Sequence, residues 1–164
     1  YGIDAKIVRL FRTYGPRLTL NDGHMLSDFA YAALNNKDLV IFGGEQFSSS
    51  LVYISDVINA VINLMKTELT GPYNIGGDVE INMTEVAKKV MELTRSTSKI
   101  MYKDNIEFMS PMLLPKISRI KKDIGWFPIV RLDEGLAKTI DHLKAQKSLL
   151  RYSHETGEDE KPKE

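Results

Sequence analysis

The sequence predicts an α/β fold, in which strands and helices alternate along the chain. Short runs of β-branched and aromatic residues recur between turn signals, as buried strands require. Longer segments between them repeat apolar residues at intervals of three and four, which is the spacing of one helix face. The 164 residues, 43% of them apolar, are enough to bury one hydrophobic core. We therefore expect one α/β domain without an internal repeat.

Charge and cysteine content argue against several classes of function. Lysine plus arginine and aspartate plus glutamate number 22 each, so the net charge is zero and we predict neither a nucleic-acid nor a membrane partner. The chain has no cysteine and three dispersed histidines, so we predict no metal site and a cytoplasmic location. Because the first residue is Tyr1 rather than methionine, we expect a fragment of a longer protein.

The beginning of the chain predicts two strands around one helix. Residues 8–11 (VRLF) are expected to be a strand buried on both faces in the middle of a parallel sheet, and a Gly-Pro turn ends it. A helix is predicted over 25–35, with Asn21 or Asp22 as its cap. Its apolar face comprises Leu26, Phe29, Ala30, Ala33 and Leu34. Residues 39–42 (LVIF) form the second predicted strand.

A serine-rich stretch and an amphipathic helix follow. Residues 48–50 (SSS) are predicted to be a flexible loop, and residues 51–54 a third strand. A helix is expected from 57 to 66, capped by Ser55 or Asp56. Its buried face is predicted to comprise Val57, Ile58, Val61, Ile62 and Met65.

The remaining predicted elements are two short strands and three helices. The strands are expected at 73–75 and at 100–102, the second on a sheet edge. Asn82 is predicted to cap the first helix, and the other two helices cover 115–124 and 132–147. The buried face of the first helix comprises Val86, Ala87, Val90 and Met91. That of the last helix comprises Leu136, Ile140 and Leu143.

Four sequence blocks, in order and at matching spacing, resemble one enzyme family. They are RTYGPRLTLNDGH at 12–24, YISDV at 53–57, GPYNIG at 71–76, and IGWFP at 124–128 followed by LDEGL at 132–136. These blocks are similar to segments of the NAD-dependent nucleotide-sugar epimerases, dehydratases and decarboxylases, which are extended short-chain dehydrogenases. The pattern is most similar to that of the UDP-glucuronate decarboxylases.

The resemblance implies the C-terminal part of a Rossmann-type α/β protein, made of the last sheet strands and a small substrate-binding lobe. Residues 1–150 are then the substrate-binding portion, and residues 151–164 a disordered polar tail. The resemblance also implies a nucleotide-sugar substrate, a homodimer and, in the intact enzyme, NAD as the cofactor that takes and returns a hydride.

Two motifs that the family needs for catalysis are absent from the 164 residues. No Gly-rich turn such as G-x-G-x-x-G is present to seat the pyrophosphate of a dinucleotide. No tyrosine is followed four residues later by a lysine, so the phenol that exchanges a proton with the sugar hydroxyl is missing. We therefore predict no catalytic residue in this chain and no activity of the chain alone.

The resemblance also implies binding residues, most of them in the loop after the first strand. Cofactor contacts are implied for Thr13, Thr19 and His24. Substrate contacts are implied for Arg12, Tyr14, Arg17 and Ser49. Some of these residues have plain structural alternatives: the threonines can bond to local backbone, and the histidine can simply be exposed.

The chain departs from the family pattern at positions that bind phosphate. The family's asparagine is replaced by Arg12, and its two nucleotide-binding arginines fall on Ser49 and Leu113. Serine and leucine cannot supply the bidentate, charge-assisted bonds of a guanidinium. Arg12 either replaces the missing clamp from the opposite wall or forms a salt bridge at the strand end. A second function therefore stays open, that of a non-catalytic relative that acts as a binding or assembly module.

The first predicted strand has an apolar surface that another part of the protein, or another chain, would have to cover. Residues 8–11 are apolar enough for the middle of a sheet, but no strand precedes them in the printed sequence. We expect an exposed apolar surface there, covered by a second copy of the chain or by rearranged elements.

Overall fold

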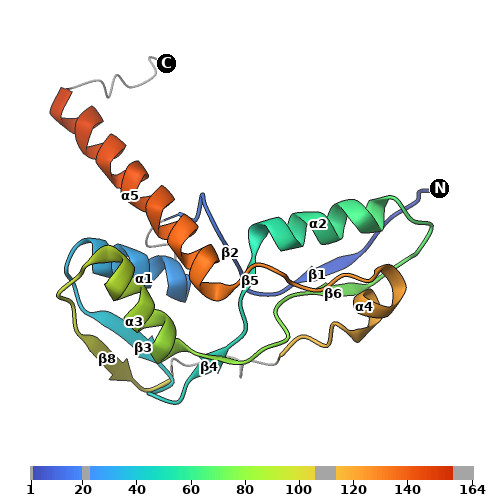
Figure 1. Ribbon diagram of the computed structural model, residues 1–164, viewed down its shortest axis with the longest axis horizontal. Coiled ribbons are helices and arrows are strands. Elements are labelled where there is room, and N and C mark those ends of the chain that lie inside the picture. The colour runs from blue at the N-terminus through green and yellow to red at the C-terminus, as the bar shows by residue number, and fades with distance from the viewer. Residues whose placement is uncertain (1, 20–22, 106–113, 157–164) are drawn as a thin grey trace.

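The computed structural model describes residues 2–19, 23–105 and 114–156, and their architecture is α/β (Figure 1). The strands in these ranges form two-stranded pairs. The parallel pairs are β1 (Val8–Leu10) with β6 (Tyr73–Ile75), β2 (Thr13–Tyr14) with β5 (Val52–Tyr53), and β3 (Leu39–Phe42) with β8 (Ile100–Lys103). The antiparallel pair joins β4 (Ser48–Ser49) to β7 (Ile81–Asn82). The α/β prediction is confirmed.

The helices follow local signals that are visible in the sequence. They are α1 (Met25–Leu34), α2 (Ile54–Met65), α3 (Met83–Thr94), α4 (Ser118–Ile124) and α5 (Leu132–Thr156). Asn82 caps α3 as predicted, because its side-chain oxygen accepts a hydrogen bond from the Thr84 amide at 2.8 Å. Gly125 ends α4 at φ +67°, a left-handed conformation that glycine adopts without strain. None of the described helices has the length and apolar character needed to cross a membrane.

One part of the molecule, here called the helical lobe, consists of α1, α3, α5, β3 and β8 (Figure 1). Its core is made of side chains from all three helices and from β3. The predicted faces of these helices supply most of it: Phe29, Ala30, Ala33, Val86, Ala87, Val90, Leu136, Ile140 and Leu143. The alternation of β3 buries Leu39 and Ile41 completely, while β8 is an exposed edge strand as predicted.

The other part, here called the open-sheet region, consists of β1, β6, α2 and α4 (Figure 1). A second, smaller core joins α2 and α4 to the two strands. It comprises Val52, Val57, Ala60, Leu64, Tyr73, Ile75, Ile117, Ile120 and Trp126. The pair β2–β5 continues from this region into the helical lobe, where Tyr14 and Tyr53 join the larger core.

The prediction that strand 8–11 is buried on both faces is wrong for this chain. Leu10 is 58% exposed, and within the described residues β1 pairs with β6 alone. A strand that is paired on one edge leaves its other edge and part of its apolar surface open to solvent. The expected exposed apolar surface is thereby confirmed, and Ile3 and Ile7 extend it. What covers it stays a prediction.

The predicted buried face of α2 is also wrong in part. The helix begins at Ile54, three residues early, with Tyr53 rather than Ser55 or Asp56 at the N-cap position. Val57, Ala60 and Leu64 are buried, whereas Ile58, Ile62 and Met65 are exposed, with Met65 68% exposed. The small Ala60 side chain allows close approach to the sheet, so the helix packs through this face rather than through its bulkiest residues.

Several predicted boundaries also change. Residues 48–49 form β4 rather than part of a flexible loop, and α4 begins at Ser118 rather than at 115. The last helix extends to Thr156, past residue 151, where the tail was predicted to begin. His24 occupies the N-cap position of α1, and the predicted caps Asn21 and Asp22 lie outside the described residues. Residues 157–164 of the predicted tail and Leu113 lie outside them too.

Candidate functional site

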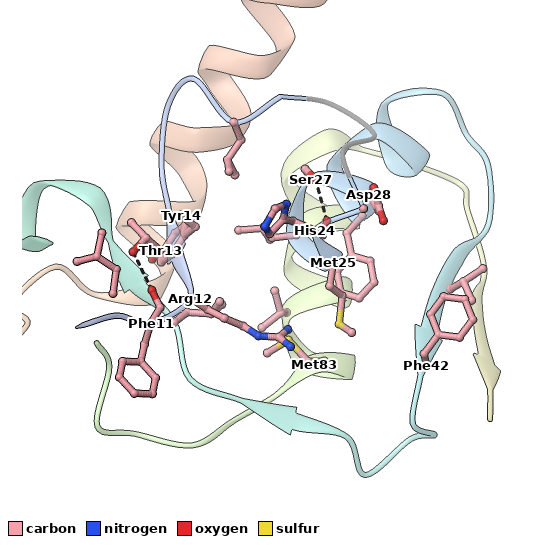
Figure 2. Close-up of a pocket in the computed structure, with 18 residues that line it drawn as sticks. Phe11, Arg12, Thr13, Tyr14, His24, Met25, Ser27, Asp28, Phe42 and Met83 are labelled. Carbon is pink, nitrogen blue, oxygen red and sulfur yellow. Dashed lines mark hydrogen bonds between the residues drawn. The ribbon is translucent and has the colours of Figure 1, made fainter. Parts of the chain in front are cut away.

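A cavity of about 840 Å³ lies where the end of β1, the strand β2, the start of α1, and β3 meet (Figure 2). Its polar side chains come from two segments, the chain around β2 and the first turn of α1. They are Arg12, Thr13, Tyr14, His24, Ser27 and Asp28. Its opposite walls are apolar and include Phe29, Val40, Phe42, Leu51, Met83 and Val86. Four of the seven predicted binding residues, Arg12, Thr13, Tyr14 and His24, therefore line one cavity.

Arg12 is held at the cavity wall by the strand ladders on both sides of it. The Phe11 amide donates to the Ile75 carbonyl at 2.9 Å, and the Arg12 carbonyl accepts from the Val52 amide at 3.0 Å. Figure 2 shows the Arg12 side chain extending across the cavity toward Met83. It is half-buried, and this burial lowers the pKa of its guanidinium because the charged form loses water. The predicted salt bridge at the strand end is not formed with any described residue.

Thr13 and Tyr14 line the cavity with their polar atoms already bonded to backbone. The Thr13 hydroxyl donates to the Phe11 carbonyl at 2.8 Å (Figure 2), which is the local backbone bond weighed as its structural alternative. Tyr14 is 3% exposed, and its ring meets the edge of the Tyr53 ring at 5.5 Å between centroids. Its hydroxyl donates to the Leu132 carbonyl at 3.5 Å, and burial, followed by the charge of Tyr53, raises the Tyr14 pKa.

The start of α1 forms the mouth of the cavity. His24 is exposed there, and its carbonyl accepts from the Asp28 amide at 3.0 Å and from the Ser27 hydroxyl at 2.8 Å. Ser27 itself is fully buried. Within the described ranges, no group of three or more histidine, aspartate or glutamate side chains gathers where a metal ion could bind.

The other three predicted binding residues lie elsewhere. Arg17 and Thr19 are exposed on the loop that follows β2, outside the set of residues that line the cavity. Ser49 is 2% exposed within β4, and its hydroxyl donates to the Ser50 carbonyl at 3.2 Å. The position where the family carries an arginine is therefore an interior strand position here. The binding roles of these three residues stay predictions.

The sequence reasoning missed the apolar wall that β3 contributes. Leu39 and Ile41 point into the core of the helical lobe, and Val40 and Phe42 therefore face the opposite side, where both line the cavity. The alternation of strand side chains was the signal that separates these two faces. It did not reveal the cavity, because a run of four apolar residues suggests burial on both faces.

Comparisons with known proteins agree on the family. The model of the NAD dependent epimerase/dehydratase family matches residues 1–76. UDP-glucuronic acid decarboxylase 3 of Arabidopsis thaliana is 38% identical over 136 residues, which are 83% of this chain and 40% of that protein. UDP-glucuronic acid decarboxylase 1 of Xenopus tropicalis is 30% identical over 145 residues, 88% of this chain and 34% of that protein. The chain thus spans little more than a third of the length of these curated relatives.

A solved structure shows the same fold. The UDP-glucose 4-epimerase of Thermotoga maritima, solved with UDP-glucose, superposes with a TM-score of 0.82 at 24% identity. The superposition covers 90% of this chain and 48% of that chain. The Rossmann-type assignment from the sequence blocks is confirmed by this likeness. By its sequence blocks, by the family model that matches residues 1–76 and by its fold, the chain is similar to members of the NAD-dependent epimerase/dehydratase family.

Proposed function

We propose that the chain is the substrate-binding portion of an NAD-dependent nucleotide-sugar-modifying enzyme, of the UDP-glucuronate decarboxylase kind or a related epimerase or dehydratase. The observation that carries this proposal is the meeting of Arg12, Thr13, Tyr14 and His24 at one cavity of about 840 Å³. Pockets of roughly 300–1,000 Å³ with mostly apolar walls and a few polar groups are typical of small-molecule sites. A nucleotide sugar has a planar base whose faces can stack on apolar walls, and anionic phosphates that can meet the polar groups.

In this proposal the chain contributes orientation rather than acid–base chemistry. The apolar wall around Val40 and Phe42 receives the planar base, and the Arg12 guanidinium faces the phosphates. Holding the sugar in one orientation lowers the activation free energy of the reaction, because the reacting groups no longer have to meet by a random encounter. The resemblance assigns proton transfer with the sugar hydroxyl to a Tyr-x-x-x-Lys pair, which the 164 residues do not contain.

NAD fits these residues less well than the nucleotide sugar does. When bound in the intact enzyme, NAD would accept a hydride from the sugar and return it. Three residues were predicted to contact NAD. The Thr13 hydroxyl already donates its hydrogen bond to the Phe11 carbonyl, and Thr19 lies outside the cavity. His24 at the mouth is the contact that remains. We therefore propose that this chain alone neither binds NAD tightly nor turns it over.

Isothermal titration calorimetry with UDP-glucuronate, UDP-glucose and NAD tests the proposal. We expect saturable heat with a UDP-sugar and none with NAD. A cavity-filling variant, Val40→Trp, should abolish the heat, because the added ring projects into the cavity that Val40 lines. Met101→Trp is the matched control, since Met101 is the register partner of Val40 on β8, is exposed, and lies outside the cavity. Equal heats from both variants would contradict the assigned cavity.

A second candidate function is that of a non-catalytic relative that serves as a binding or assembly module. It is favoured by the interior position of Ser49 in β4, where the family pattern has a nucleotide-binding arginine. The exposed apolar surface around Leu10 supports an assembly role, including the predicted homodimer. A folded chain that gives no heat with any UDP-sugar, and that forms dimers by light scattering, would favour this candidate.

A further inference from the structure

The charge in the cavity is distributed differently from what the family pattern implies. That pattern places nucleotide-binding arginines at the positions of Ser49 and Leu113 and a neutral asparagine at position 12. In the structure Ser49 is buried and bonded to its neighbour, whereas a guanidinium stands at position 12 inside the cavity. The guanidinium that this chain places in the cavity is therefore the one at position 12.

Arg12 is placed where an unpaired cation is unfavourable without a ligand. Its side chain is half-buried among apolar groups, and burial lowers the pKa of its guanidinium. Among the described residues it has no hydrogen-bond acceptor and no carboxylate partner. The cavity's carboxylate, Asp28 on the first turn of α1, forms no ion pair with Arg12, and His24 lies at the mouth. A charge desolvated without a partner destabilises the empty site and favours an anion that enters it.

We propose that Arg12 is the anion clamp of this cavity, and that it binds a phosphate group of the ligand through its two parallel N–H donors. This inference rests on the proposed function, which it deepens by naming the residue that recognises the phosphate. The planar guanidinium matches phosphate geometry in a bidentate way that a lysine ammonium cannot reproduce. Because the strand ladders hold the backbone on both sides of Arg12, the base of its side chain is fixed at the cavity wall before the ligand arrives.

The clamp is tested by comparing ligands with and without phosphate. We expect the wild-type chain to bind UDP more tightly than uridine in calorimetric titrations. Arg12→Met should weaken UDP binding by about 10- to 100-fold, the range for losing charged hydrogen bonds, and leave uridine binding unchanged. Arg12→Lys should recover part of the loss. Arg9→Gln is the matched control, because Arg9 is an exposed arginine three residues away that does not line the cavity.

The outcomes separate the clamp from the proposed function. Pyrophosphate binding that Arg12→Met abolishes, without binding of any UDP-sugar, would support the clamp and overturn the nucleotide-sugar proposal. UDP binding that survives Arg12→Met with its preference over uridine intact would overturn the clamp alone. No binding of UDP or pyrophosphate by the folded wild-type chain would overturn both. Equal urea midpoints for all variants serve as the folding control.

Discussion

The helical lobe and the open-sheet region bury their apolar residues to very different extents. In the helical lobe, three helices close over β3, and Leu136 and Leu143 on α5 are fully buried. In the open-sheet region, Leu10 on β1 and Ile58, Ile62 and Met65 on α2 are exposed. The two regions have similar kinds of sequence, since both contain apolar strands and amphipathic helices. The difference lies in how many neighbours each one has in this chain.

This difference explains where the candidate site lies. The cavity is at the junction, where β2 leaves the open-sheet region and meets α1 and β3 of the helical lobe. One region supplies apolar walls and the other supplies the charged side chain at position 12. Substitutions in the two regions test this difference in burial.

The largest difference in unfolding free energy is expected between substitutions at a buried and at an exposed apolar residue. Leu136→Ala should lower the free energy of unfolding by about 2–5 kcal/mol, because it leaves a cavity in the larger core. Leu10→Ser should change it by no more than about 0.5 kcal/mol, because the side chain is already in water. Urea denaturation followed by circular dichroism measures both. Equal losses would mean that β1 is covered in solution.

Asp56 ties the open-sheet region to the segment that leads into α5. Its carboxylate accepts from the amides of Ile129 at 3.1 Å and Val130 at 3.0 Å, and its carbonyl accepts from the Trp126 indole. Asp56→Ala should cost about 1–3 kcal/mol, because the two amides lose their acceptor. Asp56→Asn, which keeps one oxygen, should cost less. Fluorescence of Trp126, the single tryptophan, reports the transition, and unchanged urea midpoints for both variants would rule out this role.

Gly135 lies at the contact between α5 and the β2–β5 pair. A Cβ there would stand 2.3 Å from the Tyr14 hydroxyl oxygen and 2.9 Å from the Tyr53 ring. Gly135→Ala gains about 1 kcal/mol of helix propensity but loses about 1–3 kcal/mol to overpacking, so we expect a small net loss of stability. Adding Tyr14→Phe removes the nearest atom and should restore part of it in thermal denaturation. A gain in stability from Gly135→Ala alone would show that the two regions can shift apart.

The smallest effect is expected on the surface of the helical lobe, where Lys89 on α3 pairs with Asp133 on α5. The Lys89 hydrogen bond lowers the pKa of Asp133, so the folded state favours its deprotonated form. The stabilisation is therefore present above the usual pKa of an aspartate and is lost as the pH falls through the lowered value. Lys89→Met should lower the urea midpoint slightly at neutral pH and not at acid pH. A difference that persists in acid would contradict this assignment.

Local signals predicted the secondary structure well, because their causes are local. The Asn82 cap, the Gly125 stop and the strand at 73–75 depend on a few adjacent residues, and all three are confirmed. The faces of α1, α3 and α5 were also predicted, because each has one apolar stripe. The burial of strand 8–11 could not be predicted locally, since it depends on which strands lie beside it.

The face of α2 shows a second limit of the sequence. Its apolar residues surround more than one side of the helix, and the periodicity alone favoured the bulky Ile58 and Ile62 over Ala60. In the structure Ala60 packs in the core, and Ile58 and Ile62 are exposed. The cavity was predicted in its polar half, from residues around Arg12 and His24, and missed in its apolar half around Phe42. The sequence blocks shared with the family point to polar binding residues. The apolar sequence of β3 does not distinguish a cavity wall from a buried core strand.

The proposed function requires that the cavity at the junction hold a nucleotide sugar. Amide chemical shifts of the isotope-labelled chain, followed by NMR while UDP-glucuronate is added, test it most directly. We predict saturable shifts at Thr13, Met25 and Phe42, which line the cavity, and none at Ile62 on the outer face of α2. Shifts confined to α2 and β1, or no shifts in a folded chain, would contradict the claim.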